Sequence, residues 1–168
     1  YPIITIICHF CAHHLAALYL QASNHCYSSH LQPMPTIEQL ENNYWGSEPS
    51  YDSYLVTTIY QLRQKPLEDF TTEDLRICIG QNQSLPILIP MALQVLQQDL
   101  LAEGHHYPGD LLTAVLTSQP SFWESHPHHK TAFIHLFRKK QQRIKHSPLC
   151  TPKEKAAFFE LFKQHFIL

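Results

Sequence analysis

The hydrophobic pattern of the chain is most distinctive at residues 85–96, where Gln94 is the only polar residue. A helix with this composition would be apolar on every side, as in helices that lie in a core or a membrane. The stretch is too short for a membrane span, which takes about 20 apolar residues. Pro86 and Pro90 are best tolerated in a first turn, where no backbone N–H is missed. The pattern therefore predicts a buried central helix, with Leu93 in the core.

Helix-capping residues on both sides of this stretch predict two further helices that pack against it. Thr71 can cap a preceding helix through its hydroxyl, and Glu73 and Asp74 suit the positive N-terminal end of that helix. Residues 104–109 are expected to end the central helix, and Asp110 is expected to cap a third one. Three helices are thus predicted within residues 70–116.

The residues before this region predict two outer helices. Thr36 and Gln39 have the spacing of a capping box, which predicts a short helix after Thr36. Asp52 or Ser53 can cap the next helix, in which apolar residues recur at helical spacing until Pro66 interrupts it. Both helices are expected to cover the central one.

After residue 116 the chain is expected to become irregular. His126, His128 and His129 invite a metal site, but the sequence offers neither a nearby carboxylate nor a helical HxxxH pair. A solvated loop is therefore the favoured interpretation, with a metal site as the alternative.

The last 39 positions, residues 130–168, predict two helices. The first is amphipathic over residues 130–145. Thr151, Pro152 and Glu154 then form a capping box with proline in the first turn of a closing helix. In the amphipathic helix the expected inward residues are Phe133, Leu136, Phe137 and Ile144, and the expected outward residues are Arg138, Lys139, Lys140 and Arg143.

The elements together predict the fold class. No stretch has the alternation of a strand, and no internal repeat of the length typical of helical solenoids is present in the sequence. We expect an all-α protein, a single bundle of about six to eight short helices around the buried central helix, with neighbours mostly antiparallel.

Several separated blocks resemble one known family. They are TIEQLE, SYLVTTIYQLRQKPL, TTEDLR, IGQ, LPILIP, AL, VL, LAEG and YPGDLL, which follow one another between residues 36 and 123. In this order the blocks resemble the immunity proteins of bacterial contact-dependent growth inhibition systems. The resemblance implies a cytoplasmic protein that binds and neutralises one cognate toxin domain, often a nuclease. It does not name the toxin.

The composition divides the chain into an uncharged start and a predicted helical domain at residues 34–168, which we expect to be the functional part. Residues 1–33 contain no Asp, Glu, Lys or Arg. Cys8 and Cys11 form a CxxC, and nearby histidines make zinc an alternative. A structural zinc site usually has two regular ligand pairs, which these residues do not form. The favoured interpretation is an extension outside the fold, with Met34 as the expected start of the functional protein.

Charge is segregated along the remainder of the chain. Residues 34–124 hold 12 acidic and 3 basic side chains, a net charge of −9, whereas residues 125–168 hold 2 acidic and 9 basic ones, a net charge of +7. The total of −2 conceals this difference. The acidic part suits a partner that presents Lys and Arg, as proteins acting on nucleic acid do.

Catalytic signatures are absent from the sequence, which contains no P-loop, dinucleotide-binding, GxSxG or HExxH motif. We therefore expect no enzyme, no catalytic residue, no cofactor and no metal. Arg76 is expected to form a structural ion pair with Glu73 or Asp110. The predicted partner is the toxin domain, with neither a membrane nor a nucleic acid as partner. The alternative is a nucleic-acid-binding module that uses the basic helix at residues 130–145.

Toxin-binding residues are predicted among the acids that have no role at a helix end. Glu48, Asp52 and Glu103 lie in expected loops, where carboxylates are free to meet a partner. The acids at helix starts have their own explanation in the helix dipole.

Deleting residues 1–33 is predicted to leave folding and function unchanged, because the segment lacks charge, helix caps and any recognisable tie to the domain. Thermal melts of the full chain and of a chain starting at Met34 test this. A melting temperature several degrees lower in the shorter chain, or a loss of cooperativity, would contradict the prediction.

Overall fold

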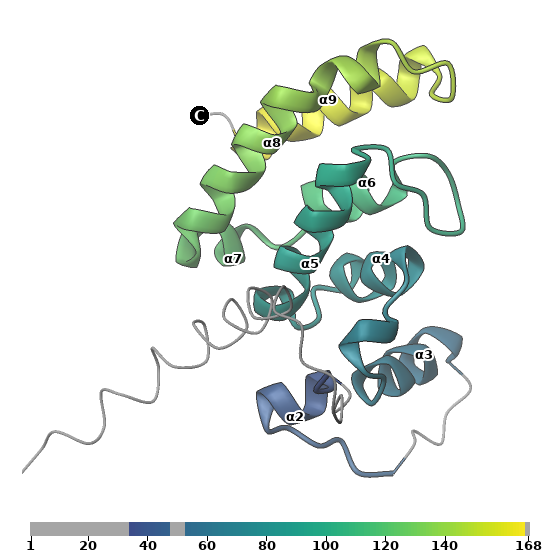
Figure 1. Cartoon of the computed structure of the whole chain (residues 1–168), viewed down its shortest axis with the longest axis vertical. Helices are drawn as coiled ribbons and strands as arrows, with labels where there is room; N and C mark the ends of the chain where they lie inside the picture. Colours follow the sequence, from purple (N-terminus) through teal and green to yellow (C-terminus); the bar gives the residue numbers. More distant parts are fainter. Residues whose placement is uncertain (1–33, 48–52, 167–168) are drawn as a thin grey trace, which may run out of the picture.

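The structure, a computed structural model, describes residues 34–47 and 53–166 (Figure 1). Within these ranges the chain forms helices and no strand, and a single antiparallel bridge joins Thr36 to Pro66. The predicted all-α class is confirmed. The helices are α2 (Ile37–Glu41), α3 (Tyr54–Arg63), the 3-10 helix η2 (Leu67–Asp69), α4 (Thr72–Gly80), α5 (Leu85–Gln98), α6 (Asp110–Leu116), α7 (Pro120–Ser125), α8 (Pro127–Lys145) and α9 (Pro152–Phe166).

The helices succeed one another in space much as they do along the chain. Helices α2 and α3 lie at one end of the molecule, and α8 and α9 form a hairpin at the other (Figure 1). Between them, α4 packs against both α5 and α6, while α6 contacts α9 and α5 contacts α8. The central helices thus connect the acidic and basic parts of the sequence.

Helix α5 is central, but only one of its faces is fully buried. The residues of that face are Leu85, Leu88, Ile89, Ala92 and Leu96. Leu93 is half-buried and packs at the edge of the core, so the prediction that it lies within the core is wrong. A short bundle does not have enough neighbouring helices to enclose α5 from every direction.

Three helix starts follow the predicted local chemistry. The Thr36 hydroxyl accepts from Gln39 N at 3.3 Å, and the Gln39 side chain accepts from Thr36 N at 2.9 Å. Thr71 begins α4 with the same reciprocal pattern. The Thr151 hydroxyl accepts from Glu154 N at 3.3 Å, and its own N–H donates to the Glu154 carboxylate at 2.6 Å. Such boxes satisfy N–H groups that a helix start leaves unpaired.

Three details of α5 and α6 differ from the prediction. Pro90 lies inside α5 rather than in its first turn. Asp110 is the first residue of α6, and the residue before the helix is Gly109, at φ 90°. The carboxylate of Asp110 is directed back to the preceding loop and therefore does not cap α6. Helix α5 also ends at Gln98, before the predicted stop at residues 104–109.

The histidine-rich segment is helical, so the prediction of an irregular, solvated loop is wrong. Pro120 and Pro127 each occupy a helix first turn, where their fixed φ is compatible with a helix start. His126 stacks on Phe122 with ring centroids 4.4 Å apart, and His129 lies in the first turn of α8. Helix α8 consequently begins three residues earlier than predicted, at Pro127 rather than at Lys130.

Aromatic side chains join the last three helices. Phe137 and Phe162 stack with centroids 3.9 Å apart, and Phe166 meets Trp123 edge-on at 5.0 Å. The indole N–H of Trp123 donates to the Ser118 hydroxyl at 2.9 Å, so the buried ring keeps a hydrogen bond. The predicted inward residues of α8 are all buried. This part of the core is aromatic, whereas the core around α5 is aliphatic.

The sequence predictions for residues 1–33, including the zinc alternative, lie outside the described residues. In the part of the chain that the structure describes, no helix is both long enough and apolar enough to cross a membrane.

Leu88→Ala is predicted to lower the free energy of unfolding by about 2–5 kcal/mol, because Leu88 is fully buried and its truncation leaves a cavity. Leu93→Ala, on the same helix, should cost roughly half as much, since Leu93 is already partly solvated. Chemical denaturation measures both values. Equal losses would mean that α5 is buried to the same extent on both sides.

Candidate functional site

A cluster of three charged side chains connects α4 with the start of α6. Arg76 on α4 donates from Nε to Glu73 Oε2 at 2.6 Å and from Nη2 to Glu73 Oε1 at 2.7 Å. Its Nε also lies 3.8 Å from Asp110 Oδ2. Both carboxylates are buried, with 8% of Glu73 and 3% of Asp110 exposed. The predicted structural ion pair of Arg76 is confirmed, with Glu73 as the closer partner.

The same two carboxylates hold the backbone of the loop between α5 and α6. Glu73 Oε2 accepts from His105 N at 3.0 Å. The two oxygens of Asp110 accept from Gly104 N at 2.7 Å and from His106 N at 3.1 Å. Three successive backbone N–H groups are therefore bound to buried, negatively charged acceptors, which form stronger hydrogen bonds than neutral ones. This arrangement fixes the path of residues 104–106.

Gly104 is needed where the loop passes over the cluster. A Cβ added at this position would lie 2.4 Å from Glu73 Oε2 and 3.1 Å from Asp110 Oδ2. Either the carboxylates or the loop would have to move to accommodate it. By contrast, a Cβ at Gly80, the last residue of α4, would meet nothing within 4 Å. An added side chain at Gly104 would therefore contact the charged cluster, whereas one at Gly80, at the other end of α4 from Glu73, would contact nothing.

Hydrogen bonds lower the pKa of the acids at this end of α4. The bidentate bond from Arg76 lowers the pKa of Glu73 below its ordinary value of 4.5; burial opposes the shift, and the His105 N–H supports it. For Asp74, burial alone would raise the pKa, but hydrogen bonds from Lys65 and Thr71 outweigh it and lower the pKa. Lys65 Nζ lies 2.7 Å from Asp74 Oδ2. Both acids are thus ionised at neutral pH.

The side chains of the supported loop face solvent. Glu103, His105, His106 and Tyr107 are exposed, and 77% of the His105 side chain is accessible. The Tyr107 hydroxyl donates to the Thr113 hydroxyl at 3.2 Å, which orients the ring. The loop therefore combines a fixed backbone with exposed polar and aromatic groups.

Of the three predicted toxin-binding acids, one lies among the described residues. Glu103 is exposed at the start of this loop. Glu48 and Asp52 lie outside the described residues. A role for any of them in binding stays a prediction. The sequence had also given no indication that Glu73 would bind the backbone N–H of His105, 32 residues further along the chain, because that requires knowledge of the loop's path.

A second exposed surface lies on α2, α3 and the segment after α2. Of the seven large apolar side chains that are exposed among the described residues, five lie here: Leu40, Tyr44, Trp45, Tyr54 and Leu55. Arg63, which is 2% exposed, lies beneath Trp45, with its Cζ 4.4 Å from the ring centroid. Its guanidinium also reaches Glu41 at 2.8 Å and Asn43 O at 2.9 Å. Arg63 thereby fixes Trp45 against α3, a role that the sequence did not suggest.

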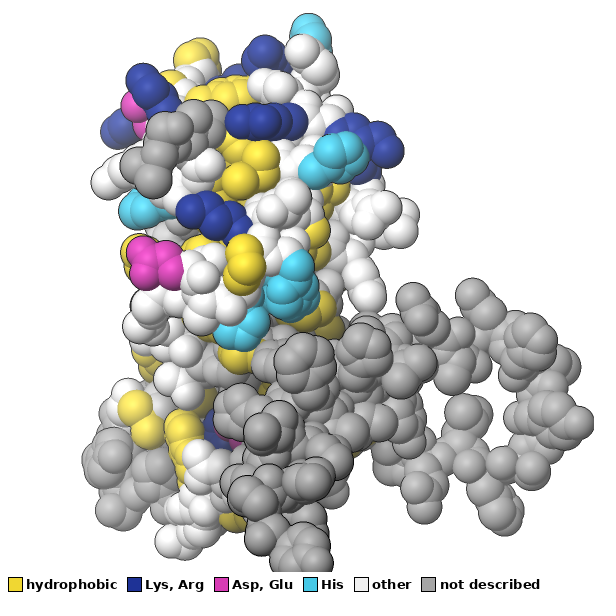
Figure 2. Space-filling view, turned by 90° about the vertical axis from the view of Figure 1, so that its left-hand side faces the viewer, with side chains coloured by type: hydrophobic (Ala, Val, Ile, Leu, Met, Phe, Trp, Pro, Cys, Tyr) yellow, Lys and Arg dark blue, Asp and Glu magenta, His cyan; other side chains and the backbone are white. Residues whose placement is uncertain are grey.

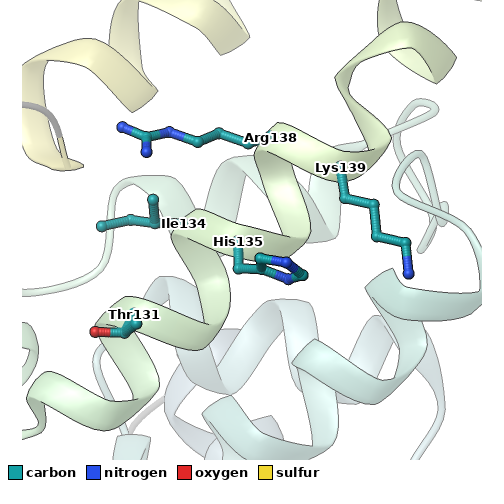
Figure 3. A pocket seen from close by; sticks show the side chains of 5 residues that line it. All are labelled: Thr131, Ile134, His135, Arg138 and Lys139. Carbon is teal, nitrogen blue, oxygen red and sulfur yellow. The ribbon is translucent and has the colours of Figure 1, made fainter.

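Helix α8 carries the basic surface. Arg138, Lys139, Arg143 and Lys145 are exposed, and Lys and Arg side chains gather on the upper part of the face seen in Figure 2, with few acids among them. A shallow pocket of about 450 Å³ lies along the helix and is lined by Thr131, Ile134, His135, Arg138 and Lys139 (Figure 3).

Part of the positive charge of α8 has structural partners. Lys140 Nζ donates to the carbonyl oxygens of Gln97 and Gln98 at the end of α5, where a helix leaves acceptors unpaired. Arg143 Nε lies 3.5 Å from Asp99 Oδ1. These contacts join α8 to α5, so the charge of α8 does not by itself indicate a ligand.

The potential metal ligands in the described part of the chain are not grouped at a site, and one of the thiols is deeply buried. No group of three or more His, Cys, Asp or Glu there could hold a metal ion. Cys78 is fully buried, and burial raises the pKa of its thiol to about 12. The thiol is therefore protonated at neutral pH and is a poor nucleophile.

These features describe a helical protein whose surfaces suit the binding of another protein. The sequence model of a family described as CDI immunity proteins matches residues 39–133, more than half of the chain. No curated protein and no solved structure matches the chain. The chain belongs to the CDI immunity protein family, whose function is the neutralisation of a toxin. The matched range includes the Glu73–Arg76–Asp110 cluster and the loop that it holds.

Stability is predicted to depend on pH through Glu73. Because its pKa is lower in the folded protein than the ordinary 4.5, its contribution is complete above pH 4.5 and is lost as pH falls through the folded-state pKa. Glu73→Gln should therefore be less stable at pH 7 and should lose less stability on acidification. Denaturation curves at pH 7, 4.5 and 3.5 measure this. If the variant keeps the acid dependence of the wild type, other carboxylates are responsible for it.

Proposed function

We propose that this immunity protein neutralises its cognate toxin domain by forming a stoichiometric complex, without catalysis or a cofactor, and that the toxin is a nuclease. Membership of the CDI immunity family carries the proposal. We also propose that residues 34–168 form the binding domain and that neutralisation takes place in the cytoplasm.

The charge of the helical body supports a basic partner. Residues 34–124 carry a net charge of −9, and they span α2 to α7 except for the last residue of α7. A nuclease binds phosphates through Lys and Arg, and an acidic inhibitor can cover the same groups. Opposite charge also speeds association by about ten to a thousandfold, which matters for an inhibitor that must act before the toxin cuts.

Exposed loop acids are the proposed electrostatic contacts. Glu103 has no helix-end or ion-pair role among the contacts of the described residues, unlike Glu73, Asp74 and Asp110. Glu48 and Asp52 are proposed with it because the sequence places them in expected loops, where carboxylates are free to meet a partner. Acids that already serve the fold are poor candidates, because their replacement would change stability and binding together.

A second candidate function is nucleic-acid binding by α8, which the exposed Arg138, Lys139 and Lys145 favour. The structural partners of Lys140 and Arg143 reduce the charge available for phosphates. Binding of random RNA or DNA that weakens steeply with salt would support this candidate. Absence of such binding, together with capture of a toxin domain, would exclude it as the main function.

The function is tested with the purified toxin domain that we expect the open reading frame immediately upstream of this gene to encode. We expect that domain to degrade RNA or DNA, and we expect one molar equivalent of the immunity protein to abolish the degradation. Light scattering of the mixture should give a 1:1 complex. If the two proteins do not associate, stoichiometric neutralisation is wrong; if they associate and the toxin has another activity, only the nuclease assignment fails.

Charge reversal tests the acidic contacts. Glu48→Lys, Asp52→Lys and Glu103→Lys should each slow association with this toxin domain and flatten its dependence on salt, because rim charges act mainly on the association rate. Glu160→Lys, at an exposed position on α9 in the basic part of the chain, is the matched control and should have a smaller effect. Association rates of the four variants with the toxin domain, measured at two salt concentrations, show which reversals change the electrostatic attraction. Equal effects of all four reversals would point to net charge rather than to these sites.

A further inference from the structure

In the exposed loop between α5 and α6, three successive backbone N–H groups are held by the buried carboxylates of Glu73 and Asp110. We propose that residues 103–107 form a preorganised recognition loop for the toxin, and that Glu73, Arg76 and Asp110 act as positioning residues for it. This inference rests on the proposed function, since it assigns the surface by which the complex forms.

The cost of the cluster is the first step of the argument. Burying two carboxylates carries a desolvation penalty, and well-packed apolar residues often stabilise a protein as well as a buried ion pair does. An apolar contact could therefore join α4 to α6. It could not accept the N–H groups of Gly104, His105 and His106, which the two carboxylates bind at 2.7–3.1 Å. The structural effect specific to this cluster is therefore that it fixes the backbone of the loop.

The second step is that the fixed loop contributes few side chains to the core. Glu103, His105, His106 and Tyr107 are all exposed, and Tyr107 is the only large apolar side chain among the exposed ones between residues 56 and 148. A loop that served only to connect α5 with α6 would not need its backbone bound by ionised acceptors. A loop that binds a partner gains from it, because less conformational entropy is lost on association.

The chemistry of the loop defines the partner. Glu103 offers a carboxylate to a cation, the imidazoles of His105 and His106 offer a donor and an acceptor each when neutral, and Tyr107 offers a ring with a polar tip. Tyrosine is frequent among the residues that contribute most to interfaces, because it offers a large contact area at low entropic cost. Because residues 34–124, to which the loop belongs, carry a net charge of −9, the matching surface is a polar, Lys- or Arg-bearing face of the toxin domain.

The test changes the position of the loop without removing any of its exposed side chains. In Gly104→Ala the added Cβ would meet Glu73 Oε2 at 2.4 Å, so either the loop or the carboxylates that hold it must shift. Gly80→Ala is the matched control, because its Cβ meets nothing. Binding to the toxin domain encoded upstream should weaken about tenfold or more in Gly104→Ala, as for loss of a hot-spot contact, and should not change in Gly80→Ala.

A second pair of variants keeps the test decisive if Gly104→Ala folds poorly. Tyr107→Ala removes an exposed side chain of the loop and should also weaken binding about tenfold, mainly through faster dissociation. Tyr54→Ala removes the most exposed aromatic side chain of α3, 82% accessible, and should bind as wild type does. Thermal melts of every variant show that the proteins compared are folded.

Each outcome decides between the two proposals. If wild-type protein does not bind the toxin domain, the proposed function fails. If wild type binds and both Gly104→Ala and Tyr107→Ala bind equally well, the function stands and the recognition loop is wrong. If Tyr54→Ala weakens binding while the loop variants do not, the interface lies on α2 and α3, which also overturns the loop.

Discussion

The path of the loop between α5 and α6 depends on the interaction between Arg76 and the carboxylates of Glu73 and Asp110. These groups lie where α4, the start of α6 and the intervening loop meet, and α4 packs closely on α6. Each carboxylate has two kinds of partner, a guanidinium and backbone N–H groups, so no charge in the cluster is left without a counterpart. Removing one member would leave another buried and uncompensated, which costs more than the pair itself contributes.

Local chemistry made much of this fold predictable. The capping boxes at Thr36, Thr71 and Thr151 involve residues three apart, so the sequence alone contains both partners. The inward face of α8 also follows from spacing along one helix. The Arg76–Glu73 pair is predictable for the same reason, because residues three apart share a helix face.

Features that depend on chain path or on distant neighbours were not predictable. Asp110 has the position of a helix cap in the sequence, but in the structure its oxygens bind Gly104 N and His106 N. Most residues around Leu93 in the sequence are apolar, but the burial of Leu93 depends on how many helices surround α5. The segment with Pro120 and Pro127 was expected to be irregular, although proline is compatible with a helix start and Phe122 provides a surface on which His126 stacks. Only the burial of Leu93 depends on distant helices. The contacts of Asp110 and of Phe122 with His126 lie within six residues, where the local pattern was compatible with more than one structure.

The distribution of charge gives the different parts of the molecule different tasks. The basic residues of α8 are partly used within the fold, as Lys140 binds the end of α5 and Arg143 lies beside Asp99. In the acidic part, Glu73, Asp74 and Asp110 are also used within the fold, and Glu103 remains at the solvent-exposed start of the loop that they help to hold. A partner that meets this loop would therefore encounter a free carboxylate on a backbone that is already ordered. Long-range attraction from the acidic body would speed the encounter, whereas the fixed loop would slow dissociation, so the two properties act on different rates of the same complex.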